Sequence, residues 1–172
     1  MRRLRDRGGE GGDGVTRYTM REKMFSIGDD FWIETEDGER AFKVNGKALR
    51  IRETLIIESR SGEELAKIQE KKLSVRDKME IERGGDTVAT VKKALVGIRD
   101  RFSIEVAGGE DMSAKGNVVD HEYKIERDGD TVAEVSKRWL RVRDAYGIEI
   151  EPGQDDALIL AVTVCIERMA RG

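Results

Sequence analysis

The sequence contains very few of the residues that build disulfide bonds or histidine-based and cysteine-based metal sites. Among its 172 residues there are one cysteine, one histidine and one proline. A single cysteine excludes an internal disulfide bond and a cysteine-based zinc site, and a single histidine excludes a multi-histidine metal centre. One proline leaves long stretches of the chain free to form regular secondary structure. We therefore expect no metal and no cofactor.

The chain also lacks an excess of positive charge and a long apolar segment. Lys and Arg total 32, Asp and Glu total 35, and the net charge is −3. Nonspecific attraction to nucleic acid needs a cationic surplus, so we expect no specific nucleic-acid partner. The longest apolar stretch, residues 157–166, is interrupted only by Thr163 and would cover roughly 15 Å as a helix, half of a hydrocarbon core of about 30 Å. Since no signal peptide is visible either, we expect a cytoplasmic protein, or one peripheral to the membrane.

The first 16 residues have the composition of a flexible tail. Residues 8–14 include five glycines, and four arginines precede them at positions 2, 3, 5 and 7. Such a segment buries nothing, and its arginines are nearly balanced by Asp6, Glu10 and Asp13. A basic arm for an anionic surface is the alternative. We expect one folded domain over residues 17–172.

From residue 17 the chain repeats itself. Residues 79–91 read MEIERGGDTVATV, and residues 123–135 read YKIERDGDTVAEV, at an offset of 44. Shorter copies of the same phrase occur at residues 51–58, 75–82 and 119–126. A fixed period of this length indicates one supersecondary unit that is used repeatedly.

The repeated unit has the pattern of a β-hairpin. Apolar and polar residues alternate with period 2 in residues 88–93 and 102–106. Glycine next to acidic residues, as in Gly84-Gly85-Asp86, marks the tight turns. Five units give ten strands, and residues 18–27 and 31–35 add two more. The sequence therefore predicts twelve strands.

After Pro152 and Gly153 the pattern changes to that of a helix. Asp155 and Asp156 suit its start, and Arg168 and Arg171 suit its end. A helix that is apolar on every side must be buried on every side. A twelve-stranded barrel is wider than an eight-stranded one, which side chains alone fill. We therefore predict a mainly β protein, a closed twelve-stranded antiparallel β-barrel around a buried C-terminal helix at about residues 154–170.

Several pieces of the chain, in their order, resemble the LURP-one-related family. They are residues 18–38, the recurring Gly-Asp-Thr-Val-Ala, Lys137-Arg138-Trp139 and the apolar helix after Asp155-Asp156. This family belongs to the tubby C-terminal-like group, which includes the phospholipid scramblases. The resemblance covers residues 17–170 and implies a twelve-stranded barrel around a helix. It implies little chemistry, although the tubby branch of the group binds phosphoinositides.

Single residues give little indication of catalysis. His121 could pair with Asp120 or Glu122 as a general base, but it occupies a position that holds connection residues in other repeats. Cys165 lies inside the apolar helix, where a thiol is a small core residue. No phosphate-binding loop, dinucleotide fingerprint or nucleophile elbow is present. We expect that the protein is not an enzyme and has no catalytic residues.

Charge is distributed unevenly between the two sets of connections. In an up-and-down barrel the glycine turns, which are acidic, lie at one rim, and the basic connections lie at the other. The predicted ligand-binding residues are Lys71, Lys72, Arg76, Lys92, Lys93, Arg99, Lys137, Arg138, Arg141 and Arg143. We expect a non-catalytic binding module that recognises anionic phospholipid head groups through this basic rim. The alternative is a structural or protein-interaction barrel without a small-molecule ligand.

Overall fold

The computed structural model describes residues 14–21, 30–46, 54–71, 78–94, 100–140 and 144–171. For Lys71, Asp100 and Arg171 it describes the backbone only. The expected tail therefore lies outside the described residues except for positions 14–16. Of these, Val15 is buried and Thr16 begins the first strand, one residue before the expected domain boundary.

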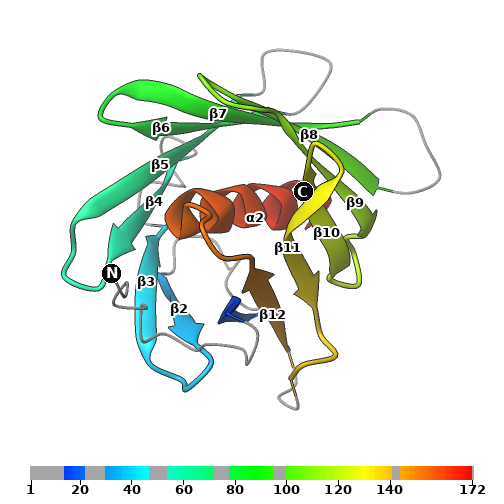
Figure 1. Ribbon diagram of the computed structural model, residues 1–172. Helices are drawn as coiled ribbons and strands as arrows, with labels where there is room; N and C mark the ends of the chain where they lie inside the picture. Colours follow the sequence, from blue (N-terminus) through cyan, green and yellow to red (C-terminus); the bar gives the residue numbers. More distant parts are fainter. Residues whose placement is uncertain are drawn as a thin grey trace, which may run out of the picture.

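Twelve antiparallel strands close into one barrel, as predicted (Figure 1). Each strand pairs with its neighbours in the chain, and β1 pairs with β12, so no strand edge is left open. The strands are β1 (Thr16–Arg21), β2 (Phe31–Thr35), β3 (Arg40–Asn45), β4 (Thr54–Ser59), β5 (Glu64–Lys71), β6 (Lys78–Arg83), β7 (Asp86–Lys93), β8 (Asp100–Val106), β9 (Met112–Asn117), β10 (Glu122–Arg127), β11 (Asp130–Ser136) and β12 (Ala145–Ile150).

Four hairpins share a register shift at the same place in the sequence repeat. It falls between an isoleucine and the glutamate that follows it, at Ile33/Glu34, Ile57/Glu58, Ile81/Glu82 and Ile125/Glu126. A bulge increases the local twist of a strand, and a sheet must twist and curve to close. The bulge at each repeated Ile-Glu pair therefore adds twist and curvature to the barrel wall just before each of these four turns.

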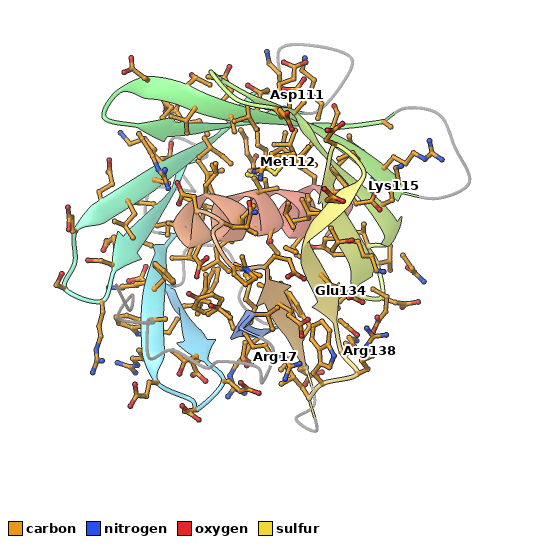
Figure 2. All side chains as sticks on the ribbon, in the orientation of Figure 1. Arg17, Asp111, Met112, Lys115, Glu134 and Arg138 are labelled. Atoms are coloured by element: carbon orange, nitrogen blue, oxygen red, sulfur yellow. The ribbon has the colours of Figure 1, made fainter. Side chains whose placement is uncertain are left out.

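The helix α2 (Asp156–Arg171) lies inside the barrel (Figure 1). Its residues 158–167 are all buried, and it packs most closely against β5, β6 and β7. Side chains from alternate strand positions point inward to meet it, for example Met112, which Figure 2 shows on the inner side of the wall. The expected central helix is confirmed, and it begins two residues later than predicted.

The two ends of the barrel differ in their connections. We call the end with the turns at 36–39, 60–63, 84–85, 107–111 and 128–129 the acidic rim. The basic rim is the end at which β1, β3, β5, β7, β9 and β11 finish. The predicted acidic residues lie at or beside the acidic rim: Glu36, Asp37, Glu39, Glu63, Glu64, Asp86, Glu110, Asp111, Asp128 and Asp130. Four arginines lie there too, at positions 40, 60, 83 and 127, so this rim is less one-sided than expected.

The helix runs from the acidic rim to the basic rim, as predicted. At its start, Arg83 Nη1 lies 2.5 Å from Asp155 Oδ2. At its end, Arg168 pairs with Glu70 near the end of β5. An acidic residue in the first turn and a basic residue in the last turn both complement the helix dipole.

Asp155 is the N-cap of α2. Its carboxylate accepts a hydrogen bond from the Leu158 amide at 3.2 Å, and its carbonyl accepts one from the Ile159 amide at 3.0 Å. The hydrogen bond from Arg83 lowers the pKa of Asp155, and the Leu158 amide acts in the same direction. The same ion pair raises the pKa of Arg83.

Two substitutions at Asp155 separate its charge from its capping role. Asp155→Asn keeps a capping side chain and should cost less than about 1 kcal/mol, because the ion pair is half exposed. Asp155→Ala loses the cap as well and should cost about 1 kcal/mol more. Because folding lowers this pKa, the ionic contribution is present above the unfolded pKa of about 3.9 and is lost as the pH falls through the folded value. Urea unfolding near pH 7 and near pH 3 tests this, and an equal difference at both would contradict it.

Candidate functional site

The structure places four of the predicted ligand-binding side chains at the basic rim. Lys92 and Lys93 end β7, and Lys137 and Arg138 follow β11. Lys71 ends β5, so Lys71, Lys92 and Lys93 lie in strands and not in connections as expected. The other five predicted residues lie outside the described residues: Lys72, Arg76, Arg99, Arg141 and Arg143.

Lys137 and Arg138 are held by the start of β10. Glu122 accepts hydrogen bonds from the Ser136 hydroxyl at 2.8 Å and from the Lys137 amide at 3.0 Å. Arg138 donates to Glu134 at 2.7 Å, and its guanidinium lies 5.3 Å from the ring of Trp139. Figure 2 shows Arg138 and Glu134 together on the outer wall. Arg138 is therefore already engaged by a carboxylate and an aromatic ring.

Lys92 and Lys93 face different sides of the barrel wall. Lys92 points outward and lies 3.0 Å from Glu105. Lys93 is half-buried and is the register partner of Phe102, whose side chain is in the core. Strands β8, β9 and β10 separate this pair from Lys137 and Arg138. Four strand spacings are roughly 19 Å. The two lysines on β7 and the two basic residues after β11 therefore lie at the same end of the barrel but do not form one cluster.

The structure fills this gap with further basic residues, and only Lys92 among them belongs to the predicted ligand-binding residues. We call the outward-facing set on β6–β10 the cationic belt; it comprises Lys78, Lys92, Arg101, Lys115 and Lys124. Lys78 is the register partner of Lys92, and Lys115 is the register partner of both Arg101 and Lys124. The signal was present in the sequence, since the position of a tight turn determines which residues face each other in a hairpin.

A buried polar cluster lies where α2 reaches the basic rim. Glu167 on the helix is fully buried, and its Oε1 lies 2.6 Å from Nδ1 of His121. Tyr123 donates a hydrogen bond to the other carboxylate oxygen at 2.8 Å. The His121 ring stacks on Tyr146, with centroids 4.1 Å apart. The partner of His121 is therefore Glu167 and not Asp120 or Glu122.

Sequence reasoning missed Glu167 because its partners come from β10 and the connection that precedes it. His121 does lie in a connection, as predicted, with a φ of 56°. This left-handed conformation is uncommon for a residue other than glycine, and here it accompanies a buried side chain. The cluster joins the end of the helix to the barrel wall at the basic rim.

Cys165 is buried in α2, as predicted. Burial raises the pKa of its thiol, so the nucleophilic thiolate is disfavoured. No group of three or more histidine, cysteine or acidic residues that could hold a metal ion occurs within the described ranges.

Both tryptophans lie on the outer wall, against cations. Trp32 in β2 has Arg40 at 4.8 Å and Lys43 at 6.0 Å from its ring. Trp139 follows β11 in the connection to β12 and packs over Gly147, whose missing side chain makes room for the ring. Arg17 lies 5.6 Å from the ring of Trp139. By contrast, Phe102, Tyr123 and Tyr146 are buried in the core.

Arg17 lies beside the Trp139 ring and also pairs with two acidic side chains. It donates to Glu149 at 2.8 Å and to Glu36 at 3.3 Å. The hydrogen bond to Glu149 raises the pKa of Arg17. The wall over β12, β1 and β2 therefore carries aromatic rings among paired charges, unlike the cationic belt.

The architecture defines the class of this protein as a closed twelve-stranded barrel filled by its own C-terminal helix. The family model for LURP-one-related proteins matches residues 16–167, so the chain belongs to the LURP-one-related family, as the sequence pattern predicted. An X-ray structure of an Arabidopsis thaliana protein has a similar fold, with a TM-score of 0.68 and 17% sequence identity over 92% of this chain and 91% of that chain. At this identity the similarity shows the fold alone. A search of curated proteins gives no match.

Proposed function

We propose that this LURP-one-related barrel is a non-catalytic binding module that recognises anionic phospholipid head groups through its basic rim. The observation that carries the proposal is the separation of charge between the two ends of one barrel. Tight acidic turns lie at one rim, and Lys92, Lys93, Lys137 and Arg138 lie at or beside the other. Each basic side chain near an anionic membrane contributes about 1 kcal/mol of attraction.

The rest of the molecule is compatible with binding at a surface without insertion of a helix. In the part of the chain that the structure describes, no helix has the length and apolar character required to cross a membrane. The buried cluster of Glu167, His121 and Tyr123 ties α2 to the wall at the basic rim.

Vesicle flotation tests the proposal. The wild-type protein should float with vesicles of an equimolar mixture of phosphatidylcholine and phosphatidylserine, and not with phosphatidylcholine alone. Binding should weaken strongly between about 0.1 M and about 1 M salt, as the Debye length falls from about 10 Å to about 3 Å. Reversal of Lys92, Lys93, Lys137 and Arg138 to Glu should abolish binding, with an unchanged circular dichroism spectrum as the control for folding. Absence of wild-type binding to either vesicle at the lower salt concentration would refute the proposal.

A protein-interaction barrel is the second candidate, and the outer wall around Trp139 favours it. Tryptophan and arginine are enriched where protein interfaces carry most of their binding energy. Trp139 is half-buried, and its ring lies close to the side chains of Arg17 and Arg138. On nearby β2, the ring of Trp32 lies close to Arg40 and Lys43 of β3. Binding to neither kind of vesicle would favour this second function.

A further inference from the structure

The cationic belt contains like charges on directly neighbouring strands. Lys78 faces Lys92 across β6 and β7, and Lys115 faces both Arg101 on β8 and Lys124 on β10. Lys71 on β5 is in turn the register partner of Lys78. Like charges that lie directly opposite each other destabilise a sheet. An arrangement that costs stability within the barrel is explained if an anionic partner covers it.

In the remaining half of the basic rim, three of the cations that the structure describes each lie beside a carboxylate. Arg21 lies 4.0 Å from Glu34, Lys43 lies 3.3 Å from Asp30, and Arg138 lies 2.7 Å from Glu134. In the belt, Lys92 has a carboxylate partner, Glu105. Among the residues that the structure describes, no carboxylate forms an ion pair with Lys78, Arg101, Lys115 or Lys124. The belt ends at β11, where Glu134 is the register partner of Lys124.

We propose that the cationic belt on β6–β10, and not the opposite half of the basic rim, is the surface through which the barrel meets an anionic membrane. This inference rests on the proposed function and specifies its orientation. The barrel would approach the membrane tilted, with β8, the middle strand of the belt, towards the head groups and with β2, on the opposite side of the closed barrel, away from them. Figure 2 shows Lys115 on the wall near β8 and β9, well apart from Arg138.

Two observations favour a lipid surface over a nucleic acid as the partner of the belt. Val119 lies in the short connection between Lys115 on β9 and Lys124 on β10, and it is 60% exposed. An apolar side chain beside cations suits a partner that is anionic at its surface and apolar beneath. The aromatic rings on which unpaired bases would stack, Trp32 and Trp139, lie on β2 and over β12, away from the belt.

Flotation of two charge-matched variants tests this orientation. Lys115→Glu with Lys124→Glu reverses two charges in the belt, and Arg21→Glu with Lys43→Glu reverses two charges in the opposite half. With vesicles of an equimolar mixture of phosphatidylcholine and phosphatidylserine, the belt variant should lose at least about 30-fold in apparent affinity, whereas the control should lose less than about threefold. Thermal melting verifies that both variants are folded. Should either unfold, Lys78→Gln with Lys92→Gln and Arg21→Gln with Lys43→Gln form a milder matched pair with the same expected order.

The outcomes separate the orientation from the function on which it rests. Equal losses in both variants, or a larger loss in the control, would overturn the orientation while wild-type binding still supports the proposed function. No wild-type binding would overturn both. Wild-type binding to a single-stranded oligonucleotide but not to acidic vesicles would also overturn both, in favour of a nucleic-acid partner.

Discussion

Val162→Asp is expected to unfold the domain. Val162 is fully buried in the middle of α2, where the helix is enclosed by the barrel. An unpaired carboxylate at this position would lose its hydration without gaining a partner, at a cost of several kcal/mol, comparable to the stability of a whole domain of about 5–15 kcal/mol. Thermal unfolding followed by circular dichroism should show no cooperative transition near neutral pH.

The control for this variant is the same substitution at an exposed valine. Val119→Asp, at a site that is 60% exposed, should change the free energy of unfolding by less than about 0.5 kcal/mol. Val162→Ala, which creates only a cavity, should cost about 2 kcal/mol and leave the protein folded. A cooperative transition for Val162→Asp close to that of Val119→Asp would show that the helix is not enclosed.

Glu167→Ala is expected to cost about 3 kcal/mol or more. The substitution leaves Nδ1 of His121 and the hydroxyl of Tyr123 without the carboxylate that they contact at 2.6 Å and 2.8 Å. Both side chains are buried, so water does not readily replace the lost partner. Urea unfolding at neutral pH measures the loss. Glu126→Ala, on a half-buried glutamate of β10, is the matched control and should have a much smaller effect.

A double-mutant cycle distinguishes this polar contact from simple loss of volume. Tyr123→Phe removes only the hydroxyl and should cost about 1 kcal/mol. If Tyr123 acts through Glu167, the effects of Tyr123→Phe and Glu167→Gln should be less than additive, with a coupling of at least about 0.5 kcal/mol. Additive effects, or a loss below about 0.5 kcal/mol for Glu167→Ala, would contradict the role of the cluster in anchoring α2.

The architecture was predictable from the sequence because its two signals are local. Period-2 alternation and glycine turns identify hairpins one at a time, and consecutive hairpins in a repeat pair with their neighbours. The apolar stretch from Leu158 to Ile166 has no polar face, so it had to be enclosed. The chain direction of α2 and the side of the barrel on which each turn lies then follow from strand alternation alone.

The contacts of the site were harder to predict from the sequence, because they join residues that are distant in the chain. His121 and Glu167 are 46 positions apart by their numbers, and only the packing of α2 against the wall brings their side chains together. In the same way, Trp139 lies beyond the end of β11 and packs on Gly147 of β12. Nothing in a local pattern identifies either partner.

The sequence by itself determined that this protein is a closed β-barrel around its own C-terminal helix, with its tight acidic turns at one end, because periodicity and turn chemistry act over a few residues. Only the tertiary structure decided how the basic rim divides. Register aligns Lys78 with Lys92, and Lys115 with Arg101 and Lys124, while Asp30 pairs with Lys43 and Glu134 pairs with Arg138. In the sequence alone these cations look equivalent. Electrostatic attraction and repulsion depend on distances in space, which only the folded structure sets.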